Sequence, residues 1–265
     1  MHCPNQYIKN DGMQRKRAAD IASTYIKQMV WTSNEIVLDI GCGPGDVTSN
    51  ILYPLLKDKI DQLVGVDKSI ENIEYAKKKY GCSKKDFKVL DIDNANDCSL
   101  YSHKFNKIFS FFCFHWIHNK ADSLRSLYSM LKNGGEIFLD FLLIPPLIVL
   151  YKSLDAEWQK YVEDINMSND LYSQNEIREK FINAGFRIIN LESKVEKYTF
   201  SNLSSFFDTF KVVDGVYDYL PQHLHARYTV HVQEKLCETQ KIEICPNTGK
   251  ITFSYTPITV HAIKD

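Results

Sequence analysis

The ten residues from Val37 to Asp46 constrain the fold of this chain more than any other stretch. They read VLDIGCGPGD, a short apolar run that contains an acidic residue and is followed by three glycines at alternate positions. This pattern predicts a strand, a tight turn and the start of a helix, because glycine adopts backbone conformations that other residues avoid. The first turn of a helix also leaves its N–H groups free to bind a ligand. We therefore expect a nucleotide-like cofactor to bind at this turn.

A second acidic residue supports this interpretation. The apolar run from Gln62 to Val66 ends at Asp67, and an acidic residue roughly 20 or more positions after such a turn binds a ribose hydroxyl in nucleotide-binding folds. The glycine spacing is GxGxG, whereas dinucleotide sites usually have GxGxxG. Asp39, directly before the turn, would repel a pyrophosphate but suits a ligand with an ammonium or sulfonium group. Two alternatives to this cofactor site remain: a glycine turn with a purely structural role, and a site for NAD.

Expected strands and helices alternate along most of the chain, which predicts a mostly parallel sheet covered on both faces. The expected helices are 13–30, a segment directly after the glycine turn, 69–80, 121–131 and 173–184. Pro54 is expected to bend or end the second of these, and the Asn133-Gly134-Gly135 stretch is expected to stop the helix 121–131. The expected strands are the run before Gly41, then 62–66, 87–92, 107–112, 136–143, 187–195 and 251–263, the last with a bulge or edge at Pro257.

Two further segments interrupt this alternation. Residues 146–171 and 198–247 follow expected strands five and six, so both leave from the carboxyl edge of the sheet, where ligands bind in open α/β sheets. Both are rich in helical periodicity. We expect them to form a helical cap on a single domain that spans residues 1–265.

Composition excludes several classes of protein. The 265 residues carry a formal net charge of −1, which gives no overall electrostatic reason to bind nucleic acid or a membrane. Seven cysteines without a CxxC pair are typical of free thiols in a reducing compartment. No signal-peptide pattern begins the chain, and the apolar run 137–151 is interrupted by Asp140 and two prolines. We therefore expect a cytoplasmic protein, with a homodimer as one option for its assembly.

Three motifs together resemble the class I S-adenosylmethionine-dependent methyltransferases: the DIGCGPG stretch from Asp39, Asp67 after the second strand, and Leu90-Asp91-Ile92 after the third. Class I enzymes have a Rossmann-like, seven-stranded, mostly parallel sheet. A further stretch, from Ser110 to the His115-Trp116 pair, is similar to small-molecule carboxylate methyltransferases. With Gln14 near a basic run and the capped C-terminal half, the whole chain most resembles the insect juvenile hormone acid O-methyltransferases.

This resemblance implies a cofactor site for S-adenosylmethionine, with no metal ion and no nicotinamide. Asp39 and Gly41 would lie by the methionine part, Asp67 would bind the ribose, and Asp91 and Ile92 would contact the adenine. The expected cofactor set is Asp39, Gly41, Gly43, Asp67, Lys68, Asp91, Ile92 and Ser110. The expected substrate set is Gln14, Trp116, His115, Phe207 and Phe210, of which Gln14 and Trp116 would hold a carboxylate and are the catalytic pair.

The chemistry of a carboxylate substrate suits these residue types. A carboxylic acid is ionised at neutral pH, so its oxygen can attack a methyl group without a general base. Neutral N–H donors, such as the Trp116 indole and the Gln14 amide, orient the carboxylate and leave it more nucleophilic than a full cation would. Each residue also has an alternative role: Trp116 could be an aromatic residue of the core, and Gln14 could be a solvated residue on the surface of a helix. His115 is expected to be structural rather than a base.

The expected cap indicates an apolar substrate. Residues 199–228 are rich in Phe, Tyr, Val and Leu, and Lys211 and Arg227 are their only Lys or Arg residues. An apolar wall suits the tail of a sesquiterpenoid acid, such as farnesoic acid or juvenile hormone acid, better than a polyacid. The alternatives are a methyltransferase for another small carboxylic acid and a non-catalytic S-adenosylmethionine-binding protein. The Asn/Asp-Pro-Pro-aromatic stretch typical of nucleic-acid amino methyltransferases does not follow the fourth strand.

Overall fold

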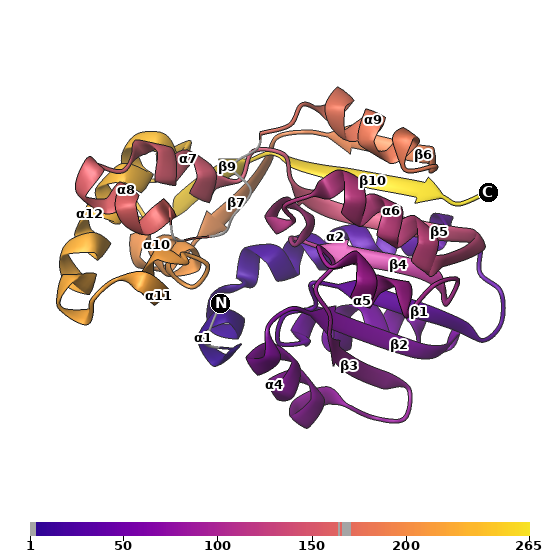
Figure 1. The fold of residues 1–265 in the computed structure, drawn as a ribbon. Coiled ribbons are helices and arrows are strands. Elements are labelled where there is room, and N and C mark those ends of the chain that lie inside the picture. The colour runs from indigo at the N-terminus through magenta and orange to yellow at the C-terminus, as the bar shows by residue number, and fades with distance from the viewer. Residues whose placement is uncertain (1–3, 164, 166–170) are drawn as a thin grey trace.

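A seven-stranded sheet forms the centre of the molecule (Figure 1). The computed structural model describes residues 4–163, 165 and 171–265. The strand order is β3-β2-β1-β4-β5-β10-β6. Strand β10 runs antiparallel to both of its neighbours, whereas the other pairs are parallel. The expected seven-stranded, mostly parallel sheet is therefore confirmed. Its strands are β1 (Glu35–Ile40), β2 (Ile60–Asp67), β3 (Lys85–Val89), β4 (Phe105–Phe111), β5 (Leu131–Leu142), β6 (Arg187–Ser193) and β10 (Pro257–Ile263).

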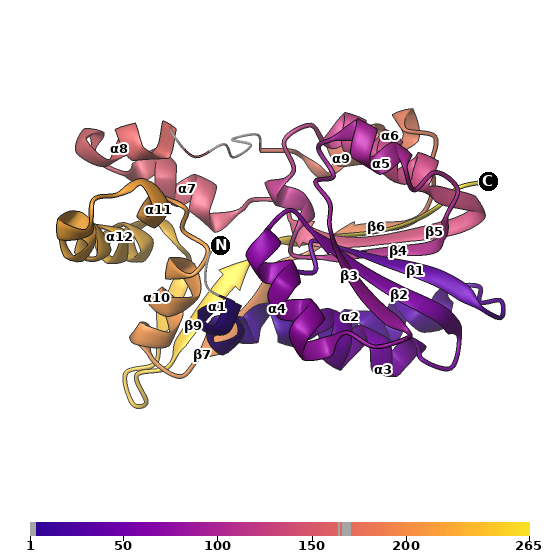
Figure 2. The same ribbon diagram turned by 60° about the horizontal axis from the view of Figure 1, so that its bottom comes forward.

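Helices cover both faces of this sheet (Figure 2). Alternate strand residues point to opposite faces: Val37 packs with α2 and α3, whereas Leu38 packs in the cluster that contains α6 and α9 residues. A short π-helical turn, Thr48–Leu52, precedes α3, so Pro54 lies near the start of α3 and does not end the helical segment. The helices are α1 (Pro4–Asn10), α2 (Gly12–Gln28), α3 (Tyr53–Leu56), α4 (Ile70–Tyr80), α5 (Ala95–Ser99), α6 (Lys120–Met130) and α9 (Gln174–Asn183).

Two predicted helix starts are confirmed by their caps. The Ser69 side chain accepts a hydrogen bond from the Asn72 N–H and begins α4. Ser173 and Glu176 form a reciprocal capping box at the start of α9. The predicted end of the helix 121–131 is confirmed to within one residue, but the Asn133-Gly134-Gly135 stretch does not mark a helix end. The helix already ends at Met130, and residues 131–135 belong to β5, because the chain there pairs irregularly with β4.

The predicted final strand 251–263 is two strands, β9 (Ile251–Tyr255) and β10. Thr256 separates them, and Pro257, which has no N–H to donate, begins the second. Strand β9 pairs with β7 (Glu196–Phe200) and β8 (Ile242–Ile244) in a separate antiparallel sheet. The prediction of one continuous strand is therefore wrong, because the chain leaves one sheet and enters another.

The cap lies beyond the carboxyl ends of the parallel strands (Figures 1 and 2). It contains the expected helices and, in addition, the small sheet, which was not predicted from the sequence. The strand β7 was missed because Glu196–Phe200 is too short to show periodicity. Residues 164 and 166–170 of the first expected insertion lie outside the described part of the chain. The cap helices are α7 (Pro146–Ser153), α8 (Ala156–Glu163), α10 (Leu203–Lys211), α11 (Val216–Tyr219) and α12 (His225–Thr239).

Buried polar contacts hold the cap together and join it to the sheet. Asp214, which is 5% exposed, accepts hydrogen bonds from the hydroxyls of Tyr151 at 2.8 Å and Tyr228 at 3.0 Å. Arg17 of α2 pairs with the fully buried Asp140 at 2.9 Å and with Glu196 of β7 at 3.2 Å. These contacts, together with the shared apolar core, fix the cap over the edge of the sheet from which it leaves.

Candidate active site

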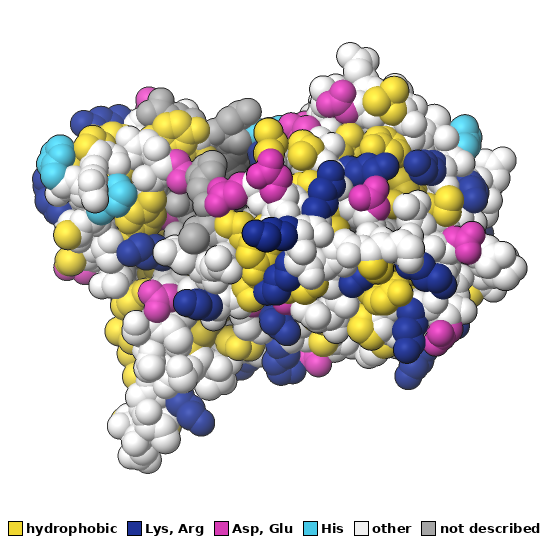
Figure 3. Space-filling view, turned by 90° about the horizontal axis from the view of Figure 1, so that it is seen from below, with side chains coloured by type: hydrophobic (Ala, Val, Ile, Leu, Met, Phe, Trp, Pro, Cys, Tyr) yellow, Lys and Arg dark blue, Asp and Glu magenta, His cyan; other side chains and the backbone are white. Residues whose placement is uncertain are grey.

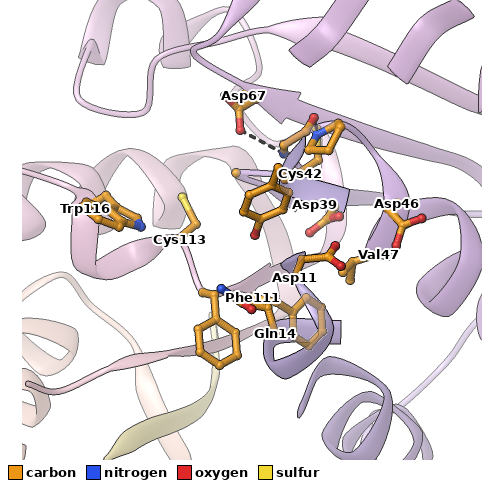
Figure 4. Close-up of a pocket in the computed structure, with 15 residues that line it drawn as sticks. Asp11, Gln14, Asp39, Cys42, Asp46, Val47, Asp67, Phe111, Cys113 and Trp116 are labelled. Carbon is orange, nitrogen blue, oxygen red and sulfur yellow. Dashed lines mark hydrogen bonds between the residues drawn. The ribbon is translucent and has the colours of Figure 1, made fainter. Parts of the chain in front are cut away.

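A cavity of about 650 Å³, counting the space open to solvent, lies at the carboxyl ends of β1, β2 and β4 (Figure 4). Among the described residues that line it, four are aspartates and none is Lys or Arg. The lining residues are Tyr7, Asp11, Gln14, Asp39, Gly41, Cys42, Gly43, Pro44, Asp46, Val47, Asp67, Phe111, Phe112, Cys113 and Trp116.

The glycine turn has the backbone that the sequence predicts. Gly41 and Gly43 have φ angles of 65° and 53°, in the left-handed region that glycine favours. A Cβ atom at Gly41 would lie 2.1 Å from the Sγ of Cys113, so this glycine allows the chain after β4 to pass close by. A Cβ atom at Gly43 would meet no atom within 4 Å. Since Gly43 lines the cavity, that open space is where a ligand can approach the main chain.

Two predicted acids lie beside this turn. Asp39 is 2% exposed and accepts a 2.6 Å hydrogen bond from the Thr48 hydroxyl. Burial raises the pKa of Asp39 to about 7, against the opposing effect of that hydrogen bond. Asp67 accepts hydrogen bonds of 2.9 Å from the N–H groups of Gly43 and Ser69, and the first is drawn in Figure 4. Burial also raises the pKa of Asp67. Both acids are thus set to receive donors or positive charge from a ligand.

A second cavity, of about 550 Å³ on the same measure, adjoins the first and extends toward the cap. No Asp, Glu, Lys or Arg side chain lines it among the described residues. Tyr7, Gln14, Phe112 and Trp116 line both cavities and so mark their junction. The lining residues are Tyr7, Met13, Gln14, Phe112, His115, Trp116, Leu142, Pro145, Pro146, Leu147, Thr209, Phe210, Val213 and Phe253.

The expected catalytic pair, Gln14 and Trp116, meets at this junction. Gln14 is 9% exposed, and its Oε1 atom is buried without a hydrogen-bond partner among the described residues. Trp116 is half-buried in the turn Phe114–Trp116 that follows β4. Figure 4 shows its indole nitrogen turned toward the other labelled residues. Neither residue is simply solvated surface or fully enclosed core, and both present polar groups where the two cavities join.

His115 lines the second cavity as a neutral side chain. Its Nδ1 atom accepts a hydrogen bond of 3.4 Å from the Leu142 N–H, so the remaining ring proton lies on Nε2. Burial and the nearby Lys120 lower the pKa of His115 to about 3. A group this weakly basic is a hydrogen-bond donor at neutral pH and a poor proton acceptor.

Five expected site residues line neither cavity. Ser110 is fully buried, and its hydroxyl donates to the Ile40 carbonyl oxygen at 3.0 Å, which joins β4 to β1. Phe207 is half-buried and packs against Phe206 inside the cap. Ile92 is buried and Asp91 is exposed, both beyond the end of β3. The five residues are Lys68, Asp91, Ile92, Ser110 and Phe207.

Several lining residues were missed by sequence reasoning. Tyr7 and Asp11 belong to α1 and to its junction with α2, a segment whose polar sequence has no motif that points to a ligand. Asp46 was visible within the glycine stretch, and Cys113 within the stretch after β4, but neither pattern assigned them a role. No group of three or more His, Cys, Asp or Glu side chains suited to a metal ion occurs in the part of the chain that the structure describes.

This fold and this site define a class I methyltransferase. The methyltransferase domain family matches residues 32–185, more than half of the chain, and the chain belongs to that family. It is similar to juvenile hormone acid O-methyltransferase of Bombyx mori, with 26% identity over 100% of this chain and 98% of the relative. The Drosophila melanogaster enzyme of the same name is 29% identical over 86% of this chain and 80% of the relative.

Other relatives and solved structures agree with this class. Malonyl-[acyl-carrier protein] O-methyltransferase 1 of Ilyobacter polytropus is 30% identical over 66% of this chain and 61% of the relative. Among solved structures, an S-adenosylmethionine-dependent methyltransferase from Mesorhizobium loti covers 93% of this chain and 97% of its own, with a TM-score of 0.53 and 14% identity. A Bacillus halodurans protein has a TM-score of 0.60 and 16% identity over 96% of this chain and 99% of its own. These structures share the fold.

The chain is therefore an S-adenosylmethionine-dependent methyltransferase, and its first cavity fits that cofactor. The cofactor carries an ammonium group, a sulfonium group and ribose hydroxyls, and the cavity offers the carboxylates of Asp39 and Asp67 and the open space beside Gly43. Three buried oxygens there, Asp11 Oδ2, Gln14 Oε1 and Asp46 Oδ2, have no hydrogen-bond partner among the described residues, although Asp46 Oδ2 forms an ion pair with Arg15. A ligand rich in donors and positive charge satisfies this set, whereas a pyrophosphate would face four aspartates.

None of the described helices is long and apolar enough to cross a membrane.

Proposed function

We propose that this protein methylates the carboxylate of an apolar small-molecule acid, most specifically a sesquiterpenoid such as farnesoic acid or juvenile hormone acid. One observation carries the proposal: Gln14 and Trp116 lie where a cofactor cavity meets a second cavity that no charged side chain lines among the described residues. The similarity to two insect juvenile hormone acid O-methyltransferases supports it.

The walls of the second cavity favour a hydrocarbon tail. Met13, Leu142, Leu147, Phe210 and Phe253 all line it. Each methylene group of a ligand that leaves water for such a wall contributes about 0.8 kcal/mol. A polyacid such as aconitate would need cations for its other carboxylates, and no Lys or Arg is found among the described residues that line this cavity. The tail would thus supply most of the binding free energy.

The junction residues would hold the reacting carboxylate. Such a group is ionised at neutral pH and needs no general base, which agrees with a His115 that is buried and neutral. The Trp116 indole and the Gln14 amide donate N–H groups without adding charge, so they would orient one oxygen toward the first cavity. The apolar walls around them would exclude water. The bound cofactor supplies an electrophilic methyl group on its sulfonium sulfur.

The test is methyl-ester formation across a series of acids from short fatty acids to farnesoic acid, with aconitate as the polar rival. We expect turnover to rise with chain length and apolarity. Trp116→Phe should lower kcat by about 10- to 100-fold with a smaller change in KM, because one hydrogen bond to a charged group is lost while the ring bulk stays. Trp158→Phe is the matched control, since Trp158 lies in the cap core and lines neither cavity.

Two results would contradict the proposal. A wild-type preference for aconitate over farnesoic acid would refute the apolar tail, and a fully active Trp116→Phe variant would refute the role of the indole N–H. Two alternatives remain distinguishable in the same assay: another small carboxylic acid would be esterified faster, and a non-catalytic S-adenosylmethionine-binding protein would methylate none. On the face shown in Figure 3, acidic side chains lie among the Lys and Arg side chains, which favours a small molecule over a nucleic acid as the substrate.

A further inference from the structure

Asp11 lies at the corner between α1 and α2, at the N-cap position of α2. An aspartate at this position normally accepts hydrogen bonds from the first N–H groups of its helix. The Asp11 side chain makes no such bond. It is 2% exposed and lines the first cavity but not the second. Its carboxylate therefore faces the cofactor cavity and leaves its own helix uncapped.

The other three acids of this cavity already have partners. Asp39 accepts from a threonine hydroxyl, Asp67 accepts from two backbone N–H groups, and Asp46 pairs with Arg15 at 2.9 Å. Asp11 is different, because its Oδ2 atom is buried and has neither a hydrogen bond nor an ion pair among the described residues, whereas the buried Oδ2 atom of Asp46 at least pairs with Arg15. A buried carboxylate oxygen without a partner is costly, and the cost is recovered when a ligand supplies a donor or a positive charge.

The charged groups around Asp11 do not provide its carboxylate with a donor or a positive charge of its own. Burial and the repulsion of Asp46 raise the pKa of Asp11 to about 7, and Arg15 opposes the shift only in part. The phenol of Tyr7, also near Asp11, has its own pKa raised by burial and by this carboxylate, so it stays neutral. Since Arg15 is already paired with Asp46, the cavity itself offers Asp11 no full cation.

The position of Asp11 selects one part of the cofactor. Gln14 lies one turn further along α2 and lines both cavities, so Asp11 is near the end of the cofactor cavity that adjoins the substrate cavity. Methyl transfer between the two ligands requires the methionine part of the cofactor at that end. The group of the methionine part that both carries positive charge and donates hydrogen bonds is its α-ammonium.

We infer that Asp11 is a cofactor-binding residue whose free carboxylate oxygen accepts the α-ammonium group of S-adenosylmethionine, and equally that of the demethylated product. This assignment rests on the methyltransferase class and is independent of the acid that is methylated. It gives the N-terminal helix pair a direct role in holding the cofactor, in addition to the glycine turn.

The test compares two ligands by isothermal titration at pH 8. S-adenosylhomocysteine carries the amino-acid part, and 5′-methylthioadenosine lacks it. Asp11→Asn should weaken S-adenosylhomocysteine by about 10- to 100-fold, the value of a charge-assisted hydrogen bond, and leave 5′-methylthioadenosine within about 2-fold. The control is Asp20→Asn, an exposed acid on the same helix, which should change neither affinity.

The pH dependence gives a second readout. Protonated Asp11 cannot accept the ammonium group, so wild-type affinity for S-adenosylhomocysteine should fall as the pH decreases from 8 to 6. Asp11→Asn should remove part of that fall. The remainder belongs to Asp39, whose pKa also lies at about 7. The affinity for 5′-methylthioadenosine should keep the same pH profile in both proteins.

Two results would overturn the inference. Unchanged S-adenosylhomocysteine binding in Asp11→Asn would show that the carboxylate does not contact the ligand. Equal weakening of both ligands would show that Asp11 only maintains the shape of the cavity. If Asp11→Asn fails to fold, Asp11→Ser replaces it, because serine is also a favourable N-cap residue. Neither ligand contains the acid substrate, so a wrong substrate proposal would leave this experiment unaffected.

Discussion

Replacing Gly43 by alanine should abolish most cofactor binding at a modest cost in stability. Gly43 has a φ angle of 53°, and alanine in this left-handed region costs about 1–2 kcal/mol. A Cβ atom there meets no protein atom within 4 Å, so the structure adds no steric cost in the free protein. The same methyl group projects into the cavity, however. Overpacking of about 1–3 kcal/mol against a bound cofactor weakens binding by up to roughly 100-fold.

Two other glycines provide matched variants. Gly134 has a φ angle of 74° and also has no atom within 4 Å of an added Cβ, but it lies in β5 away from both cavities. Gly134→Ala should therefore lose the same 1–2 kcal/mol or so of backbone free energy and no cofactor affinity. Gly41→Ala adds a clash with Cys113 at 2.1 Å, so its free energy of unfolding should fall by about 2–5 kcal/mol in total.

Chemical denaturation with and without S-adenosylhomocysteine separates these effects. A ligand present at 100 times its Kd raises the free energy of unfolding by about 2.7 kcal/mol, and a 100-fold weaker Kd reduces this gain to about 0.4 kcal/mol. At one fixed ligand concentration, the wild type and Gly134→Ala should show the larger gain and Gly43→Ala the smaller. If Gly43→Ala keeps the full gain, the cofactor does not occupy the space beside this glycine and our placement of it is wrong.

Two further predictions concern the cap. Burial raises the folded-state pKa of Asp214 from 3.8 to about 6. The contribution of this carboxyl group to stability is therefore complete below pH 4 and is lost as the pH rises through 6. Relative to wild type, the free energy of unfolding of Asp214→Asn should increase by about 3 kcal/mol between pH 4 and pH 8, and parallel urea-denaturation profiles for the two proteins would contradict this. Phe210 lines the second cavity and Phe207 does not. In the esterification assay, Phe210→Ala should therefore reduce the preference for long-chain acids, whereas Phe207→Ala should leave it unchanged. Equal effects of the two substitutions would show that both residues act through the fold of the cap.

The main sheet could be predicted from the sequence because its signals are local. Most of the parallel strands contain a short apolar run, and the caps at Ser69 and Ser173 use hydrogen bonds within one helical turn. The errors occur where distant pairing decides the structure. The apolar positions from 251 to 263 change phase between Tyr255 and Ile258, which predicts a bulge or edge at Pro257 within one strand, yet β9 pairs with β7 and β8 while β10 pairs with β5 and β6. The local pattern marks an irregularity beside Thr256, but it does not show that the two halves join different sheets.

The same distinction explains which site residues were predicted. Asp39 and Asp67 lie at the carboxyl ends of β1 and β2, Gly41 and Gly43 lie in the turn after β1, and the topology of the sheet brings such residues together at one edge. Ser110 lies just as close to the end of β4, but its buried hydroxyl bonds to the neighbouring strand and does not line a cavity. Sequence position near a strand end is thus informative for backbone turns and less so for the direction of a single side chain.

The N-terminal helices could not be assigned in this way because their place depends on the cap. The Thr209 hydroxyl of α10 donates a 3.0 Å hydrogen bond to the carbonyl oxygen of Asn10, the last residue of α1. That contact joins residues 199 positions apart and fixes the corner at which Asp11 begins α2. Tyr7 and Gln14, on either side of this corner, line both cavities. The cap therefore does more than cover the apolar cavity, because it also holds the helix corner that closes the cofactor site.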